Sequence, residues 1–148
     1  MYDAIVVGAR CAGAPTAMHL ARNGWRVLLV DRATFPRDIP HGHFIHRDGP
    51  RRLAAWGLLE GIEGHCPRVT SFTLDLGDFP LTAHNLVPDR IYAPRRSRLD
   101  HLLVEAAVEA VAELRCQVAP AITITSGRAN EVRTVSTIRI LPSIVQTA

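Results

Sequence analysis

The sequence contains no lysine, and all 17 of its basic residues are arginine. The arginines are scattered, and no helix-turn-helix, zinc-finger or RNA-binding signature accompanies them, so the net charge of +3 does not indicate a nucleic-acid-binding protein. Cysteine is scarce as well: Cys11, Cys66 and Cys116 are odd in number and show no C-x-x-C spacing. Such cysteine usage argues against a disulfide framework and is typical of a reducing compartment. We therefore expect a cytoplasmic protein.

Long hydrophobic runs are also absent. No apolar segment is long enough to cross a bilayer, and no basic segment precedes the short apolar start, so we expect neither a membrane span nor a signal peptide. His41, His43 and His46 lie close together, but no acidic residue or cysteine completes a set of ligands, and we expect no metal site. The hydrophobic fraction of 47% over 148 residues is that of a globular domain with one core.

The start of the chain has the order strand, glycine turn, helix, strand, acidic residue. Residues 4–7 form a short apolar run, typical of a parallel strand buried on both faces, and residues 27–30 form the second strand. Between them, Gly8 permits a tight turn, Gly13 removes a side chain where the helix approaches the strand, and Gly24 ends the helix. This pattern predicts a βαβ unit that binds a dinucleotide, with the pyrophosphate at the N-terminus of the helix.

Two residues of this unit are candidate ligands from their position alone. Asp31 closes the second strand, where a carboxylate can accept hydrogen bonds from an adenosine ribose. Arg10 replaces the second glycine of G-x-G-x-x-G; its side chain narrows the approach to the phosphates, yet its guanidinium can contact one. Cys11, beside it, is either a reactive thiol at a helix N-terminus or only a small side chain that fits. A βαβ unit that binds nothing is the alternative to the whole interpretation.

The middle of the chain is less regular. Residues 33–50 are rich in proline, glycine and histidine and predict a long loop. Residues 49–59 have a helical pattern, residues 70–76 alternate like a half-buried strand that turns at Gly77-Asp78, and residues 91–93 predict another short strand.

An amphipathic helix is predicted next, with one apolar stripe that packs against the sheet. Arg96 precedes the stripe and is either a solvated arginine or a ligand for an anionic cofactor. The stripe comprises Leu99, Leu102, Leu103, Ala106, Ala107, Ala110, Val111 and Leu114.

Three segments carry a resemblance to a known family. They are residues 3–32 with the pair Asp31-Arg32, residues 41–59 with the ending W-G-L-L, and residues 93–100 with the helix start R-x-x-L-D. Together they resemble the FAD-dependent oxidoreductases of the aromatic-ring hydroxylase (monooxygenase) and geranylgeranyl reductase superfamily. The resemblance implies an α/β fold with a Rossmann-like parallel sheet and a few antiparallel strands. It further implies FAD as cofactor, NAD(P)H as a candidate electron donor, and an aromatic or isoprenoid small-molecule substrate.

The resemblance also implies residue roles, and it assigns no catalytic acid, base or nucleophile. The implied cofactor-binding residues are Gly8, Arg10, Ala12 and Gly13 at the pyrophosphate, Asp31 at the ribose, Arg32 beside the adenine and Arg96 near the phosphates.

The extent of the resemblance divides the chain. Residues 1–115 are expected to form the FAD-binding portion, with residues 33–92 as an insert of loop, helix and strand, and residues 116–148 form a divergent tail with a β-hairpin around residues 126–130. The D-G and G-D motifs that follow in the family are not found beyond this point, so the chain looks truncated relative to the family. An NAD(P)-binding module without redox chemistry and a non-catalytic remnant that keeps the fold are the alternatives.

Overall fold

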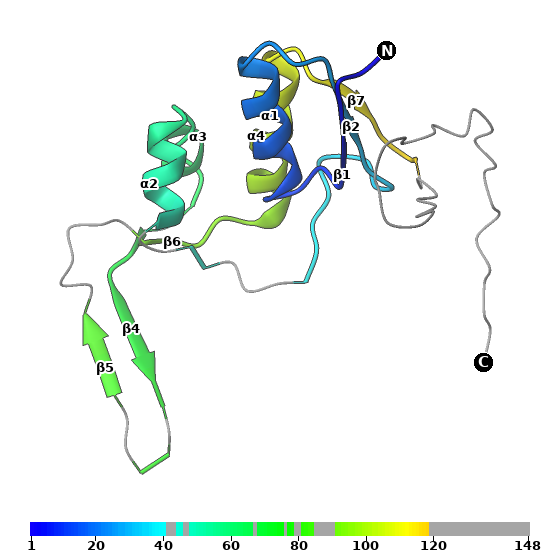
Figure 1. Ribbon diagram of the computed structural model, residues 1–148. Helices are drawn as coiled ribbons and strands as arrows, with labels where there is room; N and C mark the ends of the chain where they lie inside the picture. Colours follow the sequence, from blue (N-terminus) through cyan, green and yellow to red (C-terminus); the bar gives the residue numbers. More distant parts are fainter. Residues whose placement is uncertain are drawn as a thin grey trace, which may run out of the picture.

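The computed structural model describes residues 1–40, 44–45, 48–66, 68–75, 77–78, 81–84 and 91–118. Its main layer is a parallel sheet with the strand order β1 (Ala4–Val7), β2 (Val27–Val30) and β7 (Glu113–Arg115). Helices α1 (Gly13–Arg22) and α4 (Arg96–Glu109) lie side by side on one face of this sheet (Figure 1). The predicted α/β fold with a parallel sheet is confirmed.

The two strands of the βαβ unit differ in burial. All four residues of β2 are buried, because β2 is the middle strand of the described sheet and its apolar side chains are covered on both faces. β1 was expected to be buried on both faces, and this is wrong: its first three residues are half-buried, and Val7 is 48% exposed. Among the described residues, β1 pairs only with β2 and is therefore an edge strand.

Helix α1 ends as the glycine predicts. Gly24 has φ +84°, its N–H donates to the carbonyl of Ala21 (2.9 Å), and the N–H of Trp25 donates to the carbonyl of Leu20 (3.2 Å). This pair of bonds is the Schellman motif, in which a residue in the left-handed region lets the chain turn away from the helix. The predicted role of Gly24 is confirmed.

Helix α4 is shorter than the apolar stripe predicts. It ends at Glu109, and Val111 takes the left-handed conformation at φ +71° with 86% of its surface exposed. Leu114 belongs to strand β7 and pairs with Leu29, so the predicted continuation of the helix to residue 114 is wrong. Apolar residues continue from α4 into β7, because both elements pack against the same core.

A second group of short elements follows β2 in the chain. The predicted helix over residues 49–59 ends early, because α2 spans Asp48–Ala55 and the chain turns at Gly57 with φ +78°. A separate short helix, α3 (Glu60–Glu63), follows the predicted range. Strands β3 (Arg68–Val69) and β6 (Ile91–Tyr92) pair antiparallel.

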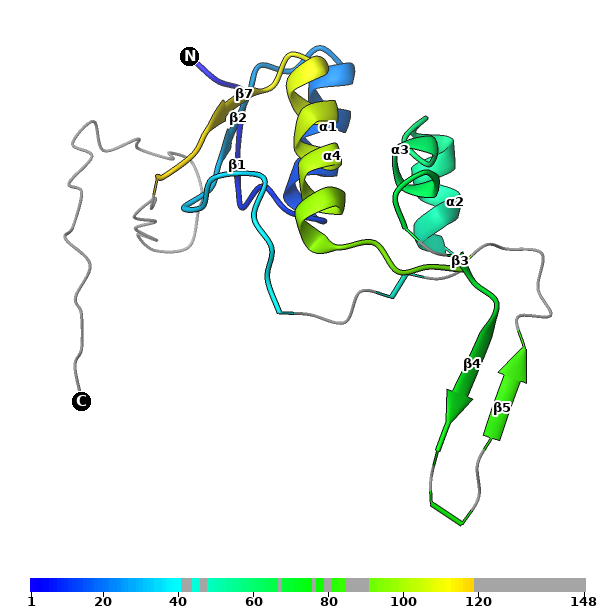
Figure 2. The same cartoon turned by 180° about the vertical axis from the view of Figure 1, so that it is seen from behind.

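A separate antiparallel hairpin joins β4 (Ser71–Leu74) to β5 (Leu81–His84) and extends away from the rest of the chain (Figure 2). The alternation over residues 70–76 correctly predicts β4, and residues 91–93 contain β6, whereas β5 has no signal in the sequence.

The core lies between the sheet and the two long helices and continues toward α2 and α3. Met18 of α1, Leu29 of β2 and Ala107 of α4 are fully buried there, and Leu53 and Ile62 extend it. No helix in the described part of the chain is long and apolar enough to span a bilayer. The expected hairpin at residues 126–130 lies outside the described residues, and the domain division at residue 115 stays a prediction.

Candidate cofactor-binding site

The turn between β1 and α1 is as tight as its glycines predict. Gly8 has φ +96°, and its N–H donates to the carbonyl of Val30 at 2.7 Å. At Gly13, a Cβ atom would lie 1.7 Å from the carbonyl oxygen of Gly8 and 3.2 Å from a methyl group of Val6. The helix N-terminus therefore touches the strand end directly, and the geometric roles of both glycines are confirmed.

A cavity of about 660 Å³ opens where β1 and β2 end. The space beyond the carboxyl ends of parallel strands is where α/β domains hold their ligands. Four of the seven predicted site residues line it, and three of its residues carry a guanidinium. The lining comprises Val7, Gly8, Arg10, Asp31, Arg32, Ala33, Arg37 and Ile39.

Asp31 fastens the two loops that border this cavity. Its carboxylate is 7% exposed; Oδ2 accepts the N–H of Ala9 at 2.7 Å and Oδ1 accepts the N–H of Ala33 at 2.8 Å. A carboxylate has about four acceptor positions, and the described part of the chain fills two of them. Asp31 thus shapes the site and keeps the capacity to accept hydrogen bonds from a ligand.

Arg10 and Arg96 meet on one buried carboxylate. Asp100 is fully buried; its Oδ2 accepts Nη1 of Arg10 at 2.6 Å, and its Oδ1 accepts Nε and Nη2 of Arg96 at 3.1 and 2.9 Å. The Arg10 side chain is 28% exposed and that of Arg96 is 13% exposed. The guanidinium of Arg10 also lies 5.5 Å from the ring centre of Phe35, a cation–π distance. The structure therefore joins two predicted site residues that are far apart in the sequence.

Ala12 and Cys11 complete the turn. Ala12 is exposed at the N-cap of α1, and its carbonyl accepts the N–H of Thr16 at 3.2 Å. The thiol of Cys11 donates to Oδ1 of Asp100 at 3.2 Å. Although Cys11 as a residue is exposed, desolvation of its sulfur, together with this carboxylate, raises the pKa of the thiol to about 11. At neutral pH the thiol is protonated, which favours the interpretation of Cys11 as a small side chain that fits over that of a reactive thiol.

The sequence interpretation missed two charged residues of this region. Asp100 stands in the R-x-x-L-D segment, four positions after Arg96, and this helical spacing was the available signal for an ion pair. Arg37 lines the cavity from a loop without periodicity, so no pattern marks it. The loop is fastened to the start of α4 by Asp38, whose Oδ2 lies 3.0 Å from Nη1 of Arg95.

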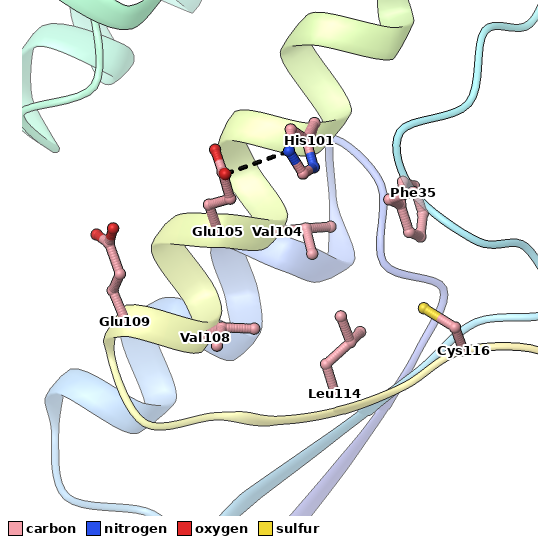
Figure 3. A pocket seen from close by; sticks show the side chains of 8 residues that line it. All are labelled: Phe35, His101, Val104, Glu105, Val108, Glu109, Leu114 and Cys116. Carbon is pink, nitrogen blue, oxygen red and sulfur yellow. Dashed lines mark ion pairs between the residues drawn. The ribbon is translucent and has the colours of Figure 1, made fainter.

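A second cavity, of about 290 Å³, lies against α4 and β7 (Figure 3). Its side chains come from α4, from β7 and from the loop that carries Phe35, and most are apolar. On its polar side, Nε2 of His101 lies 3.2 Å from Oε1 of Glu105. None of the predicted site residues lines this cavity. In the described ranges, no cluster of histidine, cysteine and acidic side chains has the arrangement of a metal site.

A glycine turn against a helix N-terminus, an acidic residue closing the second strand and an arginine-lined cavity define a dinucleotide-binding α/β domain. The chain matches the family described as FAD binding domain over residues 1–133 and belongs to that family. The resemblance to flavin-dependent oxidoreductases is thereby confirmed. The matched residues include all three segments on which the resemblance rests.

Individual relatives match the chain over part of its length. Menaquinone reductase of Mycobacterium tuberculosis is 41% identical over 63 residues, which are 43% of this chain and 15% of the relative. Squalene monooxygenase of Eremothecium gossypii is 40% identical over 62 residues, which are 42% of this chain and 12% of the relative. The matched segments are thus less than a sixth of each relative's length.

Solved structures agree on the fold. The myxobacterial chondrochloren halogenase CndH, an FAD-dependent halogenase, superposes with a TM-score of 0.73 at 25% identity, covering 85% of this chain and 31% of that one. A flavin-dependent brominase superposes with a TM-score of 0.72 at 21% identity, covering 84% of this chain and 31% of the brominase. Family members are FAD-dependent oxidoreductases and monooxygenases.

Proposed function

We propose that this chain is the FAD-binding part of an FAD-dependent oxidoreductase and holds the cofactor on its βαβ unit. The observation that carries the proposal is the arginine-lined cavity beside the glycine turn and the N-terminus of α1. The guanidinium groups of Arg10, Arg32 and Arg37 line it, and the positive end of the α1 helix dipole lies beside it; both attract phosphate oxygens. Family membership supplies the identity of the dinucleotide.

The residues present fit FAD. Gly8, Ala12 and Gly13 offer the pyrophosphate an open backbone, formed by the glycine turn and the exposed N-cap residue Ala12. In the first turn of α1 the N–H of Ala14 already donates to the carbonyl of Arg10, and Pro15 has no N–H. The acceptor positions of Asp31 that the described residues leave open suit ribose hydroxyls. Arg32 is assigned to the adenine.

The arginines supply the opposite charge for the phosphates. Arg10 lines the cavity, and Arg96 is coupled to it through Asp100. Arg37 is an additional candidate for the anionic part of the ligand.

The redox chemistry belongs to the cofactor: bound FAD supplies hydride transfer and oxygen chemistry. The side chains of this chain bind and orient it, and we assign none of them as acid, base or nucleophile. We propose NAD(P)H as electron donor. We also propose an aromatic or isoprenoid small molecule as substrate, because two relatives are named for menaquinone and squalene. We also propose the cytoplasm as compartment, because all three cysteines are free.

An absorbance scan of the purified chain, before and after addition of FAD and desalting, tests the proposal. We expect a retained flavin spectrum, and we expect Asp31→Ala to weaken FAD binding by about tenfold, since charge-assisted hydrogen bonds are lost. Asp75→Ala, at an exposed residue of the hairpin segment, is the matched control and should bind like the wild type. A folded wild-type chain that retains no flavin and binds none in titration would refute the proposed function.

A further inference from the structure

Asp100 is the most deeply buried charged residue in the described part of the chain. Its exposure is 0%, and it lies in the second turn of α4, where that helix runs beside α1. A carboxylate in such a place is costly unless cations and hydrogen-bond donors satisfy it. The hydrogen-bond donors around the Asp100 carboxylate therefore indicate the role of this residue.

The donors are the two arginines of the candidate site and one thiol. Besides the bonds already described, Oδ2 of Asp100 also accepts Nη2 of Arg96 at 3.1 Å. The guanidinium of Arg96 thus spans both carboxylate oxygens, while Arg10 approaches Oδ2 from the glycine turn. Asp100 therefore binds Arg96 in the first turn of α4 and Arg10 in the turn that precedes α1.

The charges do not cancel. Two guanidinium groups share one carboxylate, so one positive charge remains beside the N-terminus of α1, whose helix dipole is also positive. A guanidinium has five N–H donors, and Arg10 gives only Nη1 to Asp100. The remaining donors belong to a partly exposed side chain that lines the cavity. This excess of charge and donors suits a diphosphate.

The contact between Arg10 and Asp100 also determines the direction of the Arg10 side chain. Arg10 occupies the second glycine position of the fingerprint, where a side chain lying across the turn would block the phosphates. The bond to Asp100 and the stacking on Phe35 instead direct its guanidinium toward α4. A carboxylate at position 100 is thus the structural counterpart of an arginine at position 10.

We propose that Asp100 is a positioning residue for the diphosphate: it holds Arg10 and Arg96 as one unit, with Arg10 clear of the glycine turn and its free N–H groups available to the ligand. The proposal rests on the proposed function for the identity of the dinucleotide. It also makes a claim about inorganic pyrophosphate, which needs no flavin.

The test compares Asp100→Asn with Leu103→Ala in the full chain. Leu103 is 3% exposed on the same helix and belongs to the apolar core, so its truncation is the control for a loss of stability alone. We expect Asp100→Asn to weaken FAD binding about tenfold or more, and Leu103→Ala to weaken it less than about threefold, with thermal unfolding showing both variants folded. Equal losses in the two variants would overturn the proposal.

A double-mutant cycle with Arg10→Gly tests whether Asp100 acts through Arg10. Arg10→Gly leaves the carboxylate paired with Arg96 and Cys11, so this variant should fold. In its background, Asp100→Asn should cost much less FAD affinity than it does alone, because the arginine to be positioned is gone. If the loss of FAD affinity in the double variant equalled the product of the losses in the two single variants, the proposal would be contradicted.

Two further arms keep the outcomes separate. If Asp100→Asn does not fold, Asp100→Glu takes its place: it keeps the charge but displaces the oxygens by one methylene, and an unchanged FAD affinity would overturn the proposal. Protection of the wild type against thermal unfolding by inorganic pyrophosphate, lost on substitution of Asp100, would support the positioning role even if FAD did not bind. Binding of neither FAD nor pyrophosphate by the folded wild type would refute both proposals.

Discussion

Gly13 has no room for any side chain, because the carbonyl oxygen of Gly8 lies where its Cβ would be. We expect Gly13→Ala to lower the free energy of unfolding by more than about 3 kcal/mol, since the clash is with the backbone carbonyl group of Gly8 and no side-chain rotation relieves it. Chemical denaturation followed by circular dichroism measures the loss. Gly64→Ala is the control: a Cβ there meets nothing within 4 Å, and its stability should stay close to that of the wild type. Similar effects at both positions would contradict the close approach.

Cys11 illustrates how one neighbour reverses the chemistry expected of a helix N-terminus. With a pKa of about 11, the thiolate fraction at pH 8 is small, and we expect iodoacetamide to alkylate Cys11 in the folded chain about 100-fold more slowly than a free cysteine. Mass spectrometry of timed samples gives the rate. In urea, where the contact with Asp100 is lost, the rate should rise to that of a free cysteine. Rapid labelling of the native chain would rule out the protonated state.

At the scale of single residues, the sequence predicts what the local backbone demands. Gly8 and Gly13 are recognisable because a tight turn and a close helix need them within a few positions. Asp100 and Arg37 are not recognisable in this way, because their meaning depends on Arg10 and on the cavity, both far away in the sequence. Pairing across such distances is decided by how α1 and α4 pack.

Helices α1, α2 and α4 all end with the same pair of backbone hydrogen bonds, but only two of them use glycine. Gly24 and Gly57 occupy the left-handed position after α1 and α2, whereas Val111 occupies it after α4. The N–H of Val111 donates to Val108 at 2.8 Å and that of Ala112 donates to Ala107 at 3.1 Å, which completes the Schellman motif. A β-branched residue in this region is strained.

Replacing that valine should therefore stabilise the chain. Val111 is 86% exposed, so Val111→Gly loses almost no packing, and we expect a gain of about 1 kcal/mol in the free energy of unfolding after the greater flexibility of glycine in the unfolded chain is subtracted. Urea denaturation measures it. Val108→Gly, at an exposed position inside the same helix, should destabilise by about 1 kcal/mol. A loss of stability in both variants would show that Val111 is not strained.

The elements themselves are predicted unevenly, and α4 shows why. Its apolar stripe is genuine, but the core receives helix and strand alike, so periodicity continues through Leu114 after the helix has ended. A glycine at position 111 would have marked the end, as Gly24 does for α1. The three-residue strand β7 is too short to be seen in the sequence, and only its pairing with β2 defines it.

Across the whole sheet, polar contacts tie the N-terminus to the later strands. Asp3 accepts the backbone N–H of Arg26 at 2.9 Å and pairs with its guanidinium at 2.8 Å, next to β1 and β2. On the other side, the hydroxyl of Tyr2 donates to Glu113 of β7, and Arg115 also contacts both residues. The Asp3 contacts thus connect the start of β1 to the start of β2, and the Tyr2 contacts connect the residues before β1 to β7.

The Asp3 contact predicts an acid dependence of stability. Hydrogen bonds from the Arg26 side chain and backbone hold the pKa of the Asp3 carboxyl below its usual range. A carboxyl with a lowered pKa in the folded state contributes stability above its unfolded pKa of about 4, and that contribution is lost as pH falls toward the folded pKa.

We expect Asp3→Asn to be less stable than the wild type at pH 7, with the difference shrinking below about pH 4. Unfolding free energies measured from pH 7 to pH 2 test this. Because the pair is exposed, about 1 M salt should also narrow the difference at pH 7. A difference that stays constant with pH would exclude the ion pair as its cause.

The strand order has a kinetic consequence. The middle strand β2 is complete by residue 30, yet its second partner β7 begins only at Glu113, so all of the intervening chain must be synthesised before these two strands can pair. Folding slows as the separation of paired segments grows, and loop closure costs about (3/2)RT ln n. Refolding is therefore expected to be limited by this closure. The β4–β5 hairpin lies outside the parallel sheet. Trimming it would change the free energy of closing the loop between β2 and β7 by only a few tenths of a kcal/mol.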